Sequence, residues 1–224
     1  MIKFEETQVS GFEAAIRGMR NPLTSWDKSD SAHDFQCDEC MGFARCYKVG
    51  KNDLALMRKL AHAGDDHGKF ARFINVAVDI TAPLYWWKEF DTYKVGTVSN
   101  SCSTMHKIHE KEFSVDDFSH EHLGKNPTVF LLETIRALNV ARREFLETKD
   151  KKYWWYLIQL LPMSYNQRRT GQLNYQVLNR IYHARKNHLQ PKKNGATKLP
   201  GIKTNLSRKK EPQARRVARV LRMG

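Results

Sequence analysis

Alternating β-branched residues between positions 70 and 80 constrain the fold of this chain more than any other feature. Ile74, Val76, Val78 and Ile80 are apolar at every second position, and Pro83 ends the run. Because successive side chains of a strand point to opposite faces, this spacing predicts a β-strand with one buried and one solvated face. The chain is therefore not an all-α protein.

Helical patterns outweigh this strand along the rest of the chain. Asn52 or Asp53 can cap a helix that ends at Gly64, and Asn126-Pro127 opens a second, strongly periodic helix. Two further helices are predicted over 154–161 and over about 170–186. Residues 95–103 are small and rich in hydroxyls, which predicts a loop. The predicted class is α+β.

Composition limits the kinds of protein that this chain can be. Apolar residues make up 41% of the 224, or about 92, and aromatic residues 11%, so the chain can form one sizeable core. The most apolar stretch, 154–163, is short and contains Gln159 and Pro162, so no membrane span is expected. Glu5 and Glu6 do not suit a signal peptide, and with four cysteines we expect a cytoplasmic protein with reduced thiols.

The net charge of +14 is concentrated at the C-terminal end. Residues 185–224 carry 13 Lys and Arg and one acidic residue, which leaves 25 basic and 23 acidic residues in 1–184. We therefore expect a single domain over 1–190 and a basic, disordered tail over 191–224. Such a tail either binds RNA, DNA or an acidic surface, or is a solvated segment with nonspecific attraction to polyanions.

Two clusters contain residue types that bind metals. His33, Cys37, Cys40 and Cys46 offer thiolates and an imidazole of the kind that zinc prefers. A zinc site usually shows two paired motifs, so a loop of free thiols is the alternative. His62 and His67 flank Asp65 and Asp66, which suits either a metal or acid–base chemistry, or exposed loop residues.

An aromatic segment after Pro83 combines rings with charges. Trp and Tyr alternate with Lys, Glu and Asp over 85–94, and a hydroxyl-rich stretch follows to Ser103. Such residues can stack on a flat ring, hydrogen-bond its edge and contact phosphate. The alternative is an aromatic core beside a charged rim.

Several of these segments together resemble flavin-dependent thymidylate synthase. The resemblance rests on His67, the strand through Ala82-Pro83, Glu89-x2-Thr92-Tyr93-Lys94-x2-Thr97, the loop 100–103, Leu161-Pro162, Tyr165, Asn174, Leu178, Arg185 and His188-Leu189-Gln190. It covers about residues 54–190. It implies a central, mostly antiparallel sheet with packed helices.

The resemblance also implies a set of site residues. The cofactor-binding residues would be His67, Tyr93, Lys94 and Asn174, and the substrate-binding residues Glu89, Thr97, Ser101, Ser103 and Arg185. Arg185 would also polarise the pyrimidine ring, and no metal is implied. Arg168 and Arg169 are further candidates for phosphate, and Trp87 for stacking.

The signature of the family is altered in this chain. Thr92 and Tyr93 stand where the family has Arg and His, and Gln176 replaces a flavin-contacting Arg. The loop that follows aligns either without a gap or with a one-residue insertion that recovers Asn100 and Ser103. His67 lies 25 positions before Thr92, where the family has its flavin-contacting His.

The resemblance implies an enzyme that methylates deoxyuridylate or a related pyrimidine nucleotide. It would use FAD, with NADPH and methylenetetrahydrofolate as co-substrates, and would assemble as a homotetramer. One alternative is a catalytically degenerate protein that binds nucleotides or, through the basic tail, nucleic acid. A weaker alternative is a small interaction protein with a zinc site at His33 and the nearby cysteines.

Overall fold

The computed structural model describes residues 2–34 and 46–185. It divides into two compact units. Unit 1 comprises Met1–Glu5, Asp79–Lys94 and Ser99–Gly171, and unit 2 comprises Glu6–Val78, Val95–Val98 and Gln172–Gly224. The helices described are too short or too polar to cross a membrane.

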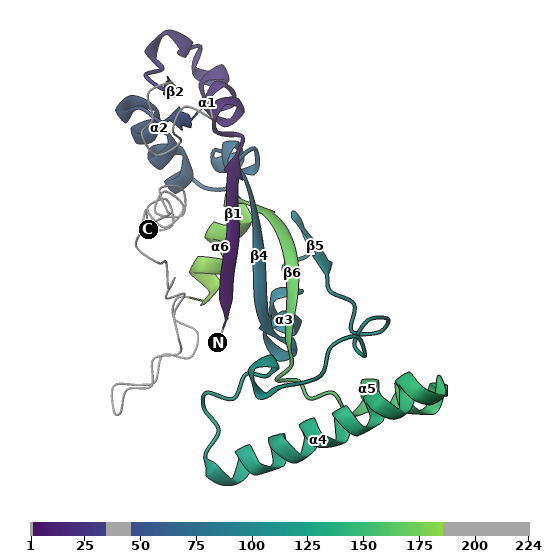
Figure 1. The fold of residues 1–224 in the computed structure, drawn as a ribbon. Coiled ribbons are helices and arrows are strands. Elements are labelled where there is room, and N and C mark those ends of the chain that lie inside the picture. The colour runs from purple at the N-terminus through teal and green to yellow at the C-terminus, as the bar shows by residue number, and fades with distance from the viewer. Residues whose placement is uncertain (1, 35–45, 186–224) are drawn as a thin grey trace, which may run out of the picture. The chain divides into compact units, whose positions relative to one another are not determined.

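A four-stranded antiparallel sheet runs through both units (Figure 1). Its strand order is β1 (Lys3–Ser10), β4 (Asn75–Pro83), β6 (Asn166–Asn174) and β5 (Thr97–Ser101). In β4 the side chains of Val76, Val78 and Ile80 are buried, while those between them are half-buried. The alternation predicted for this strand is confirmed, and so is the α+β class.

The helices of unit 2 share one core with the start of β4. They are α1 (Phe12–Arg20), α2 (Lys51–His62), the 3-10 helix η3 (Gly68–Arg72) and α6 (Tyr175–Arg185). The unit also contains two 3-10 turns, η1 (Asn21–Leu23) and η2 (Trp26–Lys28). Its second sheet pairs β2 (Ala32–Asp34) with β3 (Cys46–Lys48). The core comprises Ala15, Ile16, Met19, Met57, Phe70, Ile74, Val76 and Tyr175. The spacing of the three α1 residues places them on one side of that helix.

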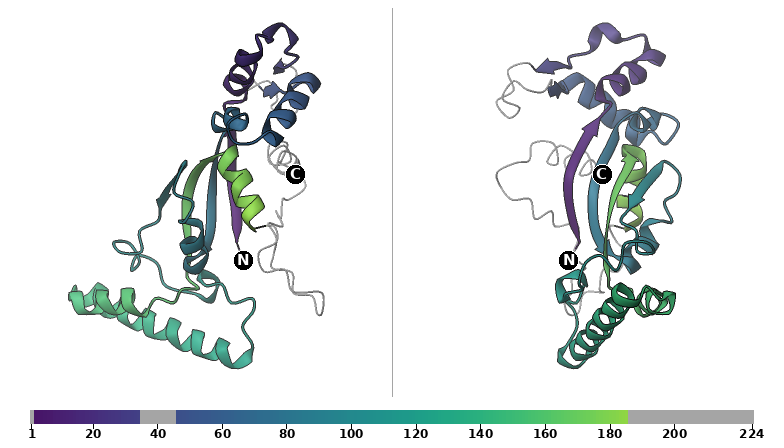
Figure 2. Two further views of the ribbon diagram at one scale, coloured as in Figure 1. Left: turned by 180° about the vertical axis from the view of Figure 1, so that it is seen from behind. Right: turned by 45° about the vertical axis from the view of Figure 1, so that its right-hand side comes forward.

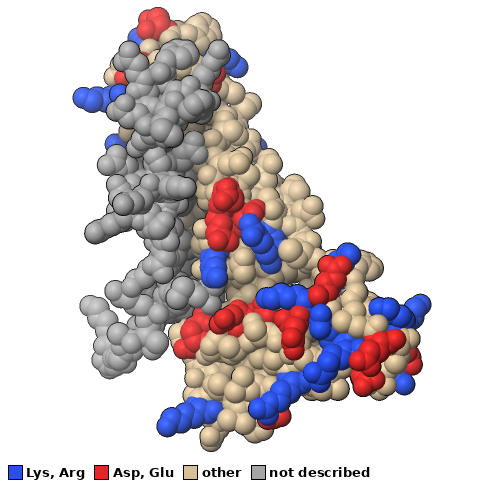
Figure 3. All heavy atoms as spheres, in the orientation of Figure 1, with Lys and Arg blue, Asp and Glu red and all other residues tan. Residues whose placement is uncertain are grey.

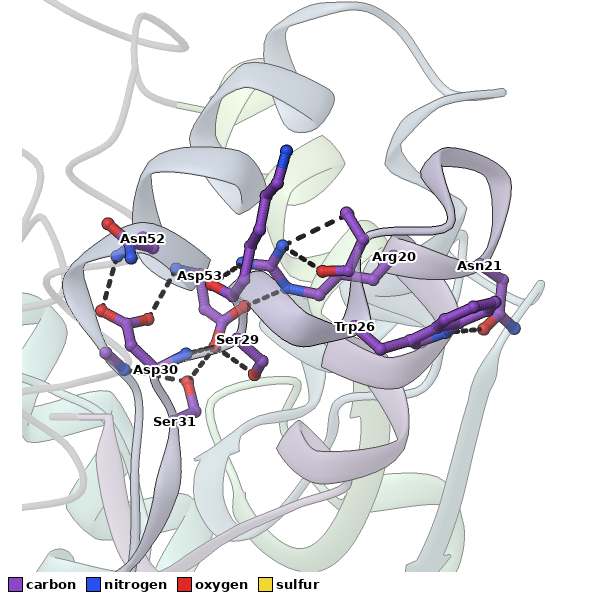
Figure 4. A network of polar contacts seen from close by, with 11 residues as sticks. Arg20, Asn21, Trp26, Ser29, Asp30, Ser31, Asn52 and Asp53 are labelled. Atoms are coloured by element: carbon purple, nitrogen blue, oxygen red, sulfur yellow. Dashed lines mark hydrogen bonds and ion pairs between the residues drawn. The ribbon is translucent and has the colours of Figure 1, made fainter.

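A buried ion pair joins α1 to α2 (Figure 4). The side chain of Arg20 is 4% exposed and that of Asp53 is fully buried, and Arg20 Nε lies 2.6 Å from Asp53 Oδ1. Ser29 Oγ and Ser31 Oγ donate to Asp53 Oδ2 at 2.8 and 2.6 Å. Burial raises the pKa of Asp53, but the hydrogen bonds from Ser31, Ser29 and Arg20 outweigh it and leave the pKa below its usual value.

The start of α2 is capped differently from the sequence prediction. The helix begins at Lys51, and the backbone N–H groups of Asn52 and Asp53 donate to the carboxylate of Asp30 at 2.9 and 3.0 Å. Asp53 is in the first turn, where its own carboxylate is committed to Arg20 and the two serines. A capping residue from a distant loop is not visible in a local pattern.

Unit 1 contains α3 (Leu84–Phe90), the 3-10 turn η4 (Val115–Asp117), α4 (Lys125–Thr148) and α5 (Lys151–Leu160). The predicted helix at Asn126-Pro127 is confirmed, and it buries Leu131, Ile135, Leu138 and Ala141 at helical spacing. Helices α4 and α5 lie side by side (Figure 2). Their shared core includes Leu157 of α5 and also Phe118, which follows η4.

Two predicted elements differ from the structure. Residues 97–101 form strand β5 rather than a loop, and residues 166–174 form strand β6, so that the last helix begins only at Tyr175. Neither strand shows apolar alternation, because β5 is almost wholly exposed and the inward positions of β6 include the polar Gln167 and Arg169 beside its exposed Arg168, Thr170 and Gln172. Pairing with β4, rather than local propensity, makes β6 a strand.

Polar pairs cover the open side of the sheet in unit 1. Arg168 Nη2 and Thr170 Oγ1 each lie 2.6 Å from the carboxylate of Asp79 on the neighbouring strand. On the face drawn in Figure 3, basic and acidic side chains are interspersed over the helices rather than gathered by sign. This mixture agrees with the small net charge of residues 1–184.

Candidate functional site

In unit 2 the turn before β5 closes on the end of β6. Gly96 has φ +79°, and a Cβ there would lie 3.0 Å from Asn174 Nδ2 and 3.1 Å from Val177 Cγ2. Only glycine fits this position without displacing the turn or the amide. The structure therefore brings two predicted site residues, Thr97 and Asn174, together through Gly96.

Asn174 and Thr97 differ in how their polar groups are used. Asn174 Oδ1 accepts a hydrogen bond from Val177 N at 3.0 Å, so the side chain caps α6. Thr97 Oγ1 is buried and has no hydrogen-bond partner among the described residues. A buried hydroxyl without a partner is uncommon in a folded protein, and it marks a place where a ligand can supply one.

Polar pairs join the segment around His67 to α6 in the same unit. His67 is exposed and directly precedes η3. Asp65 pairs with Arg180 of α6, and Arg72 Nε donates to Gln176 Oε1 at 2.5 Å. Arg185 is the last residue of α6, and its side chain lies outside the part of the chain that the structure describes.

The other predicted site residues belong to unit 1. Glu89 is exposed on α3, Tyr93 and Lys94 follow that helix as half-buried and exposed residues, and Ser101 is exposed at the end of β5. Ser103 Oγ accepts a hydrogen bond from His106 N at 2.9 Å, so this hydroxyl stabilises a turn. The signature segment thus spans the end of α3, a turn and β5.

A cluster on β6 fixes the chain on both sides of the signature segment. The guanidinium of Arg169 lies 4.2 Å from the ring centre of Trp87 and pairs with Asp91 at 2.9 and 3.1 Å. Trp87 Nε1 donates to Gln167 O at 3.0 Å, and Gln167 Nε2 donates to Cys102 O at 2.7 Å. Asp91 precedes and Cys102 follows the segment 92–101.

This cluster bears on the sequence-based hypotheses for Trp87 and Arg169. Trp87 is 1% exposed and stacks on Arg169, so its ring is not a platform for a ligand. Arg169 is 15% exposed and is committed to Asp91 and Gln167. Arg168 lies outside the cluster, in a pair with Asp79 that leaves half of the Arg168 side chain exposed, and its phosphate role stays a prediction. The role of Arg169 was missed because Asp91 and the ring of Trp87 lie 78 and 82 positions away in the sequence.

Of the two metal hypotheses, the one at His62 and His67 falls within the described residues, and the zinc hypothesis falls mostly outside them. Cys37 and Cys40, and the side chain of Cys46, lie outside them, as does the tail 191–224. His33 lies 3.3 Å from Glu13 and packs edge-on against Tyr47. Within 2–34 and 46–185, no three His, Cys, Asp or Glu side chains gather as a metal site would require.

Known structures share this architecture at low sequence identity. Thymidylate Synthase X (ThyX) from Helicobacter pylori with FAD and dUMP matches with a TM-score of 0.61 and 14% identity, over 86% of this chain and 87% of that one. This chain has the fold of flavin-dependent thymidylate synthase. A second ThyX structure from the same organism, also complexed with FAD and dUMP, matches with a TM-score of 0.58 and 14% identity over 84% and 85%.

The fold match extends beyond the residues that carried the resemblance. Residues 54–190 are about 61% of the chain, so an 86% match to the flavin-dependent thymidylate synthase fold also includes residues outside that range. The UMP/dUMP methylase PolB from Streptomyces cacaoi, bound with 5-Br UMP, aligns with a TM-score of only 0.46 at 14% identity over 81% and 75%. No family model matches the sequence, and the search of curated proteins found no match.

Proposed function

We propose that the protein binds FAD and a pyrimidine nucleotide and methylates deoxyuridylate or a close relative of it. The observation that carries the proposal is the fold that this chain shares, over most of its length, with a protein crystallised with FAD and dUMP. NADPH would reduce the flavin and methylenetetrahydrofolate would donate the carbon. The homotetramer implied by the resemblance belongs to the same proposal.

The described residues offer groups that fit such a ligand. In unit 2, the buried Thr97 hydroxyl lacks a partner and the Asn174 amide lies against Gly96. In unit 1, Lys94 is exposed and is in no ion pair within the described residues. Hydrogen-bonding groups for a ring edge and a cation for phosphate are what a flavin nucleotide requires.

Each residue has a defined task in this proposal. Reduced FAD would supply the reducing equivalents for the methylation. Asn174 and Thr97 would hydrogen-bond and orient the ring system, and Lys94 would bind phosphate. Arg185 would hydrogen-bond the pyrimidine edge, where a planar guanidinium can make two parallel contacts.

Replacement of Asn174 tests the cofactor role. Asn174→Ser keeps an oxygen that can cap α6 but removes the amide donor, so the fold should be retained while FAD binding weakens about tenfold. Asn174→Ala removes both and should also cost about 1 kcal/mol of stability. Affinity is measured by quenching of flavin fluorescence and stability by thermal unfolding.

Product formation tests the reaction itself. The protein is incubated with dUMP, FAD, NADPH and methylenetetrahydrofolate, and mass spectrometry should detect a nucleotide heavier by one methyl group. If FAD and dUMP bind but no methylated product forms, the catalytic part of the proposal is wrong. That result would favour the degenerate, nucleotide-binding alternative.

A further inference from the structure

The exposed side of α5 combines lysines with aromatic rings. Leu157 anchors the helix in the core of unit 1, where its side chain is fully buried. The exposed positions come in adjacent pairs that recur every four residues, so they occupy the half of the helix surface opposite Leu157. They are Lys151, Lys152, Trp155, Tyr156, Gln159 and Leu160. Since α5 contains no acidic residue, this face carries positive charge at its start and rings in its middle.

Both aromatic residues of this face are held in place by neighbouring rings. Trp155 is 47% and Tyr156 is 52% exposed. The ring of Trp155 packs edge-on against Trp154, with centroids 4.8 Å apart, and Trp154 Nε1 donates to Met105 O at 2.9 Å. The ring of Tyr156 packs edge-on against Tyr153, with centroids 5.8 Å apart. Because these contacts fix the rings before any partner binds, little conformational entropy is lost when a flat group stacks on them.

The lysines at the start of the face are available to an anion. Lys151 is exposed and is in no ion pair within the described residues. Lys152 Nζ lies 3.3 Å from Asp150 Oδ2 and 4.6 Å from the ring centre of Tyr153. Asp150 Oδ1 accepts the backbone N–H of Lys152, so this carboxylate also caps α5. An exposed ion pair of this kind is weak, and a phosphate can therefore bind Lys152 in place of Asp150.

A single-stranded nucleic acid matches this combination of groups. Its bases are not confined within a duplex, so they can stack on exposed rings, and its phosphates bind lysines. The lysines set this face apart from Phe130 on α4, which is even more exposed, at 74%. The residues three and four positions from Phe130 include no cation; they are Asn126, Pro127, Glu133 and Thr134.

We propose that the exposed side of α5 binds single-stranded nucleic acid, with bases stacked on Trp155 and Tyr156 and phosphates bound by Lys151 and Lys152. The proposal does not depend on FAD binding or methylation, because no residue of this face has a task in the proposed function. The 13 Lys and Arg of residues 185–224 add a general attraction to polyanions, whereas stacking requires bases. Binding at α5 is therefore recognised by its dependence on bases.

The test compares strands with and without bases. Labelled thymidine and uridine oligomers of about 15 nucleotides, and an abasic strand of the same length, are titrated with the full-length protein. Fluorescence anisotropy is recorded at low and moderate salt. The wild type should bind at least one of the two oligomers about tenfold more tightly than the abasic strand. The tighter of the two oligomers identifies the partner as DNA or RNA.

Substitutions then locate the binding on α5. Trp155→Ala and Tyr156→Ala should each weaken oligomer binding about tenfold without changing the affinity for the abasic strand, while Trp155→Phe, which keeps a flat ring, should retain most of it. Lys151→Gln should weaken binding to all three strands and reduce its salt dependence. Phe130→Ala is the matched control and should leave oligomer affinity unchanged. Thermal unfolding verifies that each variant is folded.

Three results would overturn the proposal. Equal binding of the oligomers and the abasic strand to the wild type would mean that charge alone attracts nucleic acid. Unchanged oligomer affinity in folded Trp155→Ala and Tyr156→Ala would mean that the bases do not stack on these rings. If these variants instead lower the molar mass found by light scattering without oligomer, the rings join copies of this chain and the face does not serve nucleic acid.

Discussion

Replacement of Asp53 by Ala is expected to lower the free energy of unfolding by about 3–5 kcal/mol. The substitution leaves the guanidinium of Arg20 without its countercharge, and Arg20 is almost inaccessible to solvent. Its remaining hydrogen bonds go to uncharged groups, namely Ser25 O, Ser25 Oγ and Lys28 O. It also removes the acceptor for Ser29 and Ser31. Urea unfolding followed by circular dichroism measures the loss.

Two further variants separate charge from packing in this region. Arg17→Ala removes an exposed partner of Glu13 on the same helix and should cost less than about 1 kcal/mol. Replacing Arg20 and Asp53 together by apolar residues of similar size should cost much less than Asp53→Ala, because no buried charge is then left unpaired. A cost below 1 kcal/mol for Asp53→Ala would mean that Arg20 reaches solvent.

Replacement of Trp87 by Ala is expected to cost about 3–5 kcal/mol as well, because it leaves a large cavity in unit 1. The ring packs edge-on against Trp86 and Phe90, with centroids 4.9 and 5.5 Å away, and its flat face carries the guanidinium of Arg169. Its indole N–H also holds Gln167 O. Thermal unfolding measures the cost.

The effect of Trp87→Ala should extend to the signature segment. Without the ring, Arg169 loses its stacking partner and its hold on Asp91 weakens, so amide hydrogen exchange should speed up at residues 92–94. Trp155→Ala is the matched control, since Trp155 on α5 is 47% exposed and should cost far less. Equal costs for the two tryptophans would contradict the buried position of Trp87.

The sequence predicted those parts of the fold whose pattern is local. Strand β4 was recognisable because Val76 and Val78 alternate with polar or small residues, and α4 because its start carries Asn126-Pro127 ahead of a periodic apolar stripe. Strand β6 was not, because its exposed positions are polar and its inward ones include Gln167 and Arg169. Its identity as a strand depends on its neighbours in the sheet.

For the candidate site, too, the sequence pointed to individual residues but not to their distant partners. The resemblance pointed to Thr97 and Asn174, and the turn at Gly96 brings them together. The pairs Asp65–Arg180 and Asp53–Arg20 join residues 115 and 33 positions apart, and no spacing rule reveals such partners. They follow from the packing of η3 and α6, and of α1 and α2, respectively.

FAD binding to the purified wild-type protein tests the central claim most directly. The protein is titrated with FAD near neutral pH, with and without dUMP, while the visible spectrum and the flavin fluorescence are recorded. The account predicts a yellow protein with quenched flavin fluorescence, and a further change in the flavin spectrum when dUMP is added. A protein that stays colourless and leaves flavin fluorescence unchanged at all FAD concentrations, with or without dUMP, would contradict it.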